Sequence, residues 1–69
     1  MSAISEVWIW YAETTGIQRQ YKEVTNGYPD THEFRHTYCQ ALHRDGLFIS
    51  PNIWYPGSRV LRVEFKVSA

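Results

Sequence analysis

The chain has 69 residues, of which 43% are hydrophobic and 20% are charged. This length allows one domain, residues 1–69, because two separate cores would leave each half too small to be stable alone. The composition excludes a disordered tail, and no apolar run approaches the ~20 residues of a membrane-spanning helix. Seven Lys and Arg residues balance seven Asp and Glu residues, which argues against a protein held to a polyanion by bulk charge.

The cysteine content indicates the compartment. The single cysteine, Cys39, excludes an intramolecular disulfide framework. The apolar stretch at residues 7–12 is too short for a signal peptide and follows the acidic Glu6. The sequence therefore predicts a cytoplasmic protein with no membrane partner.

Two strands joined by a tight turn are predicted near the N-terminus. Residues 7–12 are almost all β-branched or aromatic, and residues 17–24 resume with a more polar pattern. Gly16 lies between them and is expected to supply the positive φ of the turn. The predicted hairpin spans residues 6–24, and the cluster of strand-breaking residues at 25–29 follows it as a loop.

A helix is predicted over residues 31–44. Asp30 and Glu33 have the spacing of a capping box, and Gly46 is placed to end the helix in the left-handed αL conformation. Apolar side chains at positions i, i+4, i+7 and i+8 form its expected core-facing stripe. They are Phe34, Tyr38, Ala41 and Leu42.

The C-terminal part is predicted to hold the remaining strands. Residues 47–50 form one strand, and after Pro51 residues 53–55 either continue it or start another. Residues 56–57, Pro-Gly, suit the centre of a type II turn. Residues 59–67 alternate with period two and form the clearest strand. The side of this strand that is expected to face the helix carries Leu61, Val63, Phe65 and Val67.

The element order ββαββ predicts an α+β fold, with a four-stranded antiparallel sheet and one helix packed on one face. The first and last strands are the most apolar, so we expect them to pair at the centre of a sheet with order 2-1-4-3. On the first strand, Val7, Ile9 and Tyr11 are expected to face the helix. Because side chains alternate along a strand, Trp8 and Trp10 are then expected on the open face of the sheet.

The predicted helix also carries a stripe of possible metal ligands, His32, His36, Cys39 and His43. A histidine pair at i and i+4, or the Cys39 and His43 pair, can chelate Zn²⁺. The stripe spans roughly 16 Å, so the four side chains cannot surround one ion, and a carboxylate or a second chain would have to complete the site. A solvated or interface-forming stripe is the simpler interpretation, and no metal or cofactor is predicted.

No enzyme is predicted either. Cys39 and His43 could form a nucleophile and base, but a cysteine in the middle of a helix has no free backbone N–H groups beside it for an oxyanion hole. The acidic residues are scattered along the chain, and the glycines are isolated turn residues.

The open face of the predicted sheet is the best candidate for function. Indoles beside Arg and Lys are typical of protein interaction hot spots. The sequence therefore predicts a small non-enzymatic protein-binding module, an inhibitor or accessory protein that occludes or bridges a surface on a macromolecular partner. The expected partner-binding residues are Trp8, Trp10, Trp54, Arg62 and Lys66.

Two alternatives stay open. The same face could bind single-stranded nucleic acid, because rings stack on bases while Arg and Lys hold phosphates. Alternatively, two chains could form a metal-bridged homodimer by pairing their His and Cys stripes across a two-fold axis. A short, neutral chain without a cofactor motif also has the format of small phage proteins that inhibit host defence complexes, a similarity of size and composition alone.

Overall fold

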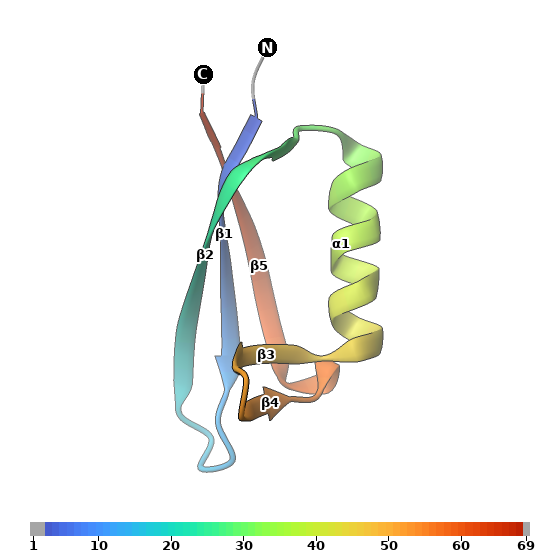
Figure 1. Ribbon diagram of the computed structural model, residues 1–69. Helices are drawn as coiled ribbons and strands as arrows, with labels where there is room; N and C mark the ends of the chain where they lie inside the picture. The colour runs from blue at the N-terminus through green and yellow to red at the C-terminus, as the bar shows by residue number, and fades with distance from the viewer. Residues whose placement is uncertain (1–2, 69) are drawn as a thin grey trace.

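The chain folds into a three-stranded sheet, one helix and a small hairpin, over the residues 3–68 that the computed structural model describes. Figure 1 shows α1 beside one face of the long strands, with the β3–β4 hairpin at one end of the sheet. The α+β class with antiparallel strands is confirmed. The elements are β1 (Ala3–Ala12), β2 (Gln18–Pro29), α1 (His32–Asp45), β3 (Leu47–Ser50), β4 (Ile53–Tyr55), the 3-10 turn η1 (Gly57–Arg59) and β5 (Val60–Ser68).

The strands form two sheets, so the predicted single four-stranded sheet is wrong. The larger sheet has the order β2-β1-β5, which confirms the expected pairing of the first strand with the last. The strands β3 and β4 form a separate antiparallel hairpin. Residues 51–52 are the reason, because they form a tight turn that folds β4 back on β3. Within this turn the Asn52 N–H donates to Ser50 Oγ at 3.3 Å.

The core lies between β1 and α1. Among the described residues, the buried side chains are Ile4, Val7, Ile9, Tyr11 and Leu47. Four of these five lie on β1, and the expected inward facing of Val7, Ile9 and Tyr11 is confirmed. Complete burial of an aliphatic side chain contributes about 1.5–3 kcal/mol to stability. The helix packs on this layer through the partly buried side chains Phe34, Tyr38 and Leu42.

The strand β5 departs from its predicted facing at its N-terminal end. Val63 and Phe65 pack against the core as expected. A bulge then places Val60 opposite Tyr11 and leaves Leu61 52% exposed. The prediction that Leu61 faces the helix is wrong, because the bulge inserts one residue and shifts the alternation of side chains.

The strand β2 continues through residues that the sequence predicts as a loop. It reaches Pro29 and pairs Tyr28 with Ile4. The strand-breaking residues are accommodated in a bulge, where the pairing with β1 is irregular. The Thr25 hydroxyl donates to the Ile4 carbonyl at 2.5 Å and accepts a hydrogen bond from the Gly27 N–H at 3.1 Å. Gly27 has a φ of 96°, which favours glycine. The cluster therefore marks a bulge within the strand and not its end.

The N-terminus of α1 is capped by Thr31. Its hydroxyl accepts a hydrogen bond from the Phe34 N–H at 3.1 Å. Asp30 instead forms an ion pair with Arg35. The predicted capping box of Asp30 and Glu33 is therefore wrong: the cap is Thr31, one residue later, and Phe34 at the third helical position cannot complete a box.

Two glycines shape the C-terminal end of α1. Gly46 has the expected positive φ, 85°, but its ψ of −173° is extended, so the predicted αL conformation is wrong. Its N–H donates to the Leu42 carbonyl at 2.8 Å. Gly57 begins η1, so the predicted type II turn is wrong. A Cβ added at Gly57 would lie 2.0 Å from the carbonyl oxygen of His43. Only a residue without a side chain lets η1 approach the end of the helix this closely.

Candidate protein-binding face

The outer face of the larger sheet, on the side away from α1, gathers most of the predicted partner-binding residues. Side chains alternate along a strand, so the inward facing of Val7 and Ile9 places Trp8 and Trp10 on the outer face. Both indoles are half-buried and lie on the central strand. We call this surface the Trp8–Trp10 face. It consists of Glu6, Trp8, Trp10, Lys22, Arg62, Glu64 and Lys66.

Each indole is covered by a cation from the neighbouring strand β5. The Arg62 guanidinium carbon lies 4.8 Å from the ring centroid of Trp10, and the Lys66 Nζ lies 4.7 Å from that of Trp8. The two indole centroids are 6.2 Å apart, with the rings tilted by 47°. A cation over an aromatic ring contributes roughly 0.5–1 kcal/mol at an exposed site. These contacts favour one orientation of the indoles before any partner binds.

A carboxylate joins the two cations. Arg62 Nη2 lies 2.7 Å from Glu64 Oε2, and Lys66 Nζ bonds the other oxygen of Glu64. The hydrogen bond from Lys66 is the main cause that lowers the pKa of the Glu64 carboxyl, so this group stays ionised near neutral pH. Of the two positive charges that Arg62 and Lys66 present on β5, one is therefore compensated within the strand.

Glu6 has the same role on the other side of the indoles. It accepts a hydrogen bond from Trp8 Nε1 at 3.1 Å, and its second oxygen lies 3.7 Å from Lys22 Nζ. The Trp8–Trp10 face thus carries three cations and two carboxylates in contact with one another. It is an aromatic and nearly neutral surface.

Trp54 lies apart from this face. It is on β4, 49% exposed, and its Nε1 donates to the carbonyl of Asp45 at the C-terminal end of α1 at 2.8 Å. The Phe48 ring is its neighbour across the hairpin, at 6.4 Å between centroids. The expected grouping of Trp54 with the two sheet tryptophans does not occur, because the hairpin pairs with itself on the helix side.

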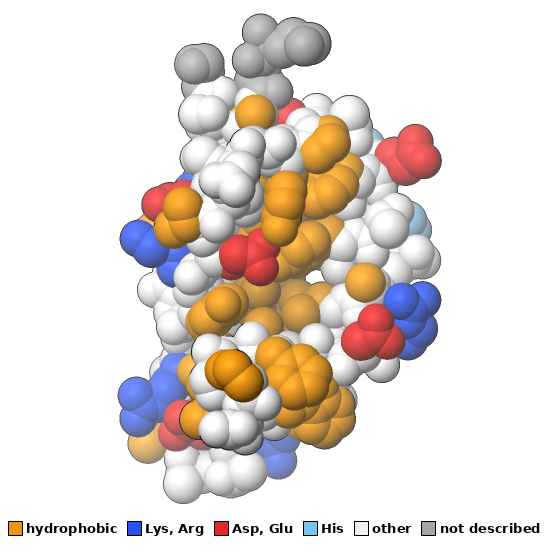
Figure 2. All heavy atoms as spheres, viewed as in Figure 1, with side chains coloured by type: hydrophobic (Ala, Val, Ile, Leu, Met, Phe, Trp, Pro, Cys, Tyr) orange, Lys and Arg blue, Asp and Glu red, His pale blue; other side chains and the backbone are white. Residues whose placement is uncertain are grey.

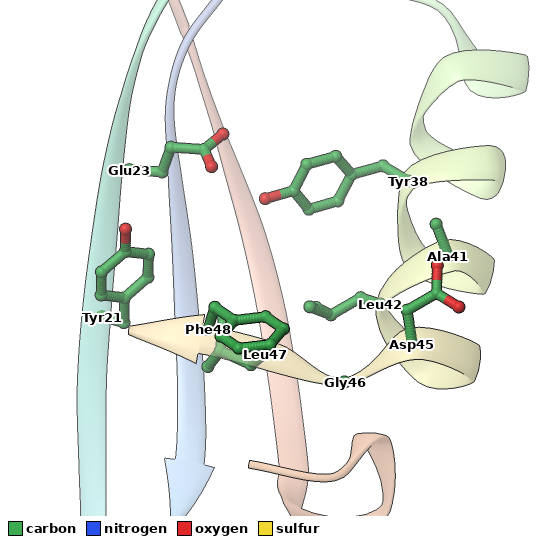
Figure 3. Close-up of a pocket in the computed structure, with 9 residues that line it drawn as sticks. All are labelled: Tyr21, Glu23, Tyr38, Ala41, Leu42, Asp45, Gly46, Leu47 and Phe48. Atoms are coloured by element: carbon green, nitrogen blue, oxygen red, sulfur yellow. The ribbon is translucent and has the colours of Figure 1, made fainter. Parts of the chain in front are cut away.

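A second surface, which the sequence analysis missed, is a groove of about 270 Å³ between α1 and β2. Figure 2 shows hydrophobic side chains gathered between the sheet and the helix. In the close-up of Figure 3, Tyr21 and Glu23 of β2 lie across the groove from Tyr38 and Leu42 of α1, near Phe48. The sequence does contain a pattern that predicts the β2 side of this groove. Side chains alternate along a strand, so Tyr21 and Glu23 lie on the same side of β2.

Two phenols at or beside the groove have raised pKa values. Burial raises the pKa of the Tyr38 hydroxyl well above its usual range, and the charge of Glu23 adds to this effect. Tyr28 donates a hydrogen bond to Glu23 at 3.1 Å, and that bond is the main cause that raises the pKa of Tyr28. Both phenols therefore keep their protons at neutral pH.

The predicted metal-ligand stripe lies along the outside of α1. The rings of His32 and His36 stack with centroids 6.2 Å apart, and these residues and His43 are exposed. Cys39 is half-buried, and burial raises the pKa of its thiol. Within residues 3–68, no group of three or more His, Cys, Asp or Glu side chains is placed to hold a metal ion. One copy of the described chain does not assemble a metal site from this stripe.

Comparison with known proteins adds no family to this description. No protein-family model, curated protein or solved structure matches the chain. Within residues 3–68, no helix has the length and apolar character needed to cross a bilayer. The functional assignment therefore depends on the geometry of the Trp8–Trp10 face.

Proposed function

We propose that this protein is a small non-enzymatic binding module that attaches to a protein partner through the Trp8–Trp10 face. One observation carries the proposal: two indoles on the central strand, each held under a cation, lie on the side of the sheet away from α1. Rings and guanidinium groups that are already oriented lose little conformational entropy on binding, which is typical of hot-spot residues. The module acts by occluding or bridging a surface of its partner, as an inhibitor or accessory protein does.

The charge of the face supports a protein partner over a nucleic acid. Nucleic-acid affinity comes largely from cations that replace the counterions of phosphates. Here Arg62 and Lys66 already bond Glu64, and Lys22 lies beside Glu6. The whole chain is neutral at pH 7. A partner with an apolar patch bordered by a few carboxylates fits this surface better than a phosphate backbone.

A non-enzymatic role is supported by the environment of the single cysteine. Burial raises the pKa of the Cys39 thiol and so opposes formation of a nucleophilic thiolate. The proposed location is the cytoplasm, which agrees with a single cysteine in the chain. No cofactor is needed for the proposed role.

The test compares two tryptophan substitutions. Trp10→Ala removes an outer-face indole, and Trp54→Ala removes an indole on the separate hairpin. The immobilised wild-type chain first captures its partner from an extract of its source organism. We expect the captured protein to bind Trp10→Ala roughly thirtyfold more weakly than the wild type, because loss of a hot-spot residue has an effect of this size. The Trp54→Ala variant should keep wild-type binding. Circular dichroism establishes that both variants are folded.

The outcome that contradicts the proposal is equal capture by the wild type and both variants. The nucleic-acid alternative rests on the same indoles and has its own measurement, a titration of tryptophan fluorescence with single-stranded oligonucleotides at low salt. We expect no change in fluorescence. Saturable quenching that weakens steeply as salt is added would favour nucleic-acid binding instead.

A further inference from the structure

The two outer strands of the larger sheet differ in how well they are protected from pairing with another strand. In the order β2-β1-β5, both β2 and β5 have one side without a strand partner among residues 3–68. Edge strands are normally guarded by Pro, bulges or inward-pointing charges. The edge of β2 has all three, because it contains Pro29, the bulge at Gly27 and the inward carboxylate of Glu23.

Beyond a bulge near its start, the strand β5 has a regular edge without these features. From Val60 to Ser68 it contains no Gly or Pro, and its helix-facing side chains Val63 and Phe65 are apolar. The bulge at Leu61 affects only its first residues, and at the second register shift, beside Lys66 and Val67, the extra residue lies on β1. Its apolar residues are incompletely covered, since Val67 is 43% exposed and none of its residues is buried. This edge is therefore open to strand addition.

The charges on β5 indicate which strand fits there. On the outer face, Arg62, Glu64 and Lys66 alternate in sign. When two copies of β5 pair antiparallel about a two-fold axis at Phe65, Glu64 of each copy lies opposite Lys66 of the other. On the helix side, Phe65 then meets its own copy and Val67 meets Val63. Opposite charges and apolar pairs directly across two strands are both stabilising.

We infer that the protein forms a homodimer in which the β5 strands of two copies pair antiparallel and join the two sheets into one of six strands. The axis at Phe65 uses the regular part of the strand, beyond the bulge. The two helices then lie on one face of the joined sheet, and the two Trp8–Trp10 faces lie on the other. This dimer needs no metal ion and no disulfide, and it does not depend on the proposed protein-binding role.

The test uses charge reversal in the full chain. Glu64→Lys makes the outer face of β5 wholly cationic, and the double variant Arg62→Glu with Lys66→Glu makes it wholly anionic. Either change puts like charges opposite each other in a homodimer, so the dissociation constant should rise roughly tenfold or more. An equimolar mixture of the two variants should recover a mixed dimer, which also shows that both chains are folded.

Sedimentation equilibrium from micromolar to millimolar concentration, with a chelator and a reductant present, measures these states. The expected wild-type mass is that of two chains, and Lys22→Glu on the opposite edge, a matched charge reversal, should keep it. A wild-type chain that stays monomeric would overturn the inference, as would a Glu64→Lys variant that dimerises normally or a mixture that stays monomeric. A dimer that the chelator dissociates would overturn it in favour of a metal bridge through the helix stripe.

Discussion

Tyr38 is the residue whose ionisation folding changes most clearly. Its ring lies among those of Tyr28, Phe34 and Phe65, with centroids 5.7–6.4 Å away. Burial and the nearby charge of Glu23 raise the pKa of its hydroxyl above the ordinary value of 10.0. A phenolate at this position would put a second negative charge into the aromatic layer that joins helix and sheet.

This shift predicts a loss of stability in alkali. The unfolded chain releases the Tyr38 proton at a lower pH than the folded chain, so the stabilisation is complete below pH 10 and falls as the pH rises above it. The Tyr38→Phe variant lacks this proton. Its urea midpoint should therefore fall less steeply above pH 10 than that of the wild type, with a much smaller difference near neutrality. Parallel alkaline curves for the two proteins would rule out this role of Tyr38.

At the scale of elements, α1 combines a partly buried face that packs on the sheet with a capped N-terminus. None of its residues is fully buried, and Thr31 is its N-cap residue. The hydroxyl of Thr31 satisfies the backbone N–H of Phe34, which has no partner within the helix. The cap also aims the helix along the sheet, where its aromatic side chains reach β1 and β5.

Two threonine substitutions separate capping from helix propensity. Thr31→Ala removes the cap and should lower the free energy of unfolding by about 1 kcal/mol. Thr37→Ala changes an exposed position within the helix and should be neutral or slightly stabilising, because alanine is the better helix former. Urea denaturation followed by circular dichroism measures both. Equal effects of the two changes would show that Thr31 does not act as a cap.

For the whole molecule, stability is concentrated in β1. This strand is paired on both sides and carries four of the five buried side chains among the described residues. The β3–β4 hairpin has strands of four and three residues, and it exposes Phe48, Ile53 and Trp54. The hairpin contacts the core mainly through the buried Leu47 and the ring of Tyr55. The ring centroids of Tyr55 and Tyr11 are 4.7 Å apart.

This asymmetry predicts the order of amide hydrogen exchange. The amides of Val7 and Ile9 should exchange last, at the rate of global unfolding, because opening them breaks both strand pairs and the core. The amides of Phe48 and Trp54 should exchange well before them through local opening of the hairpin. Exchange followed residue by residue with NMR tests this order. Equal protection of the two groups would mean that hairpin and sheet unfold together.

Local patterns in the sequence were sufficient for the central part of the candidate site. The alternation along residues 7–12 correctly places the indoles of Trp8 and Trp10 away from the helix, because the facing of a strand follows from its own periodicity. The helix and the positive φ of Gly16 and Gly46 are likewise set by nearby residues. The pairing of the first strand with the last could be inferred because these two strands carry the most apolar side chains.

The tertiary structure alone decided the remaining features. The separation of the β3–β4 hairpin, which takes Trp54 away from the other tryptophans, depends on which strand edges meet in space. The bulge that exposes Leu61 depends on how β5 fits the twist of β1. The contacts of Arg62 and Lys66 with the indoles depend on the strand register. Pairing between distant segments fixes the bulge and the register, whereas the turn at residues 51–52 fixes the hairpin, and the sequence pattern left open whether residues 47–55 form one bent strand or two.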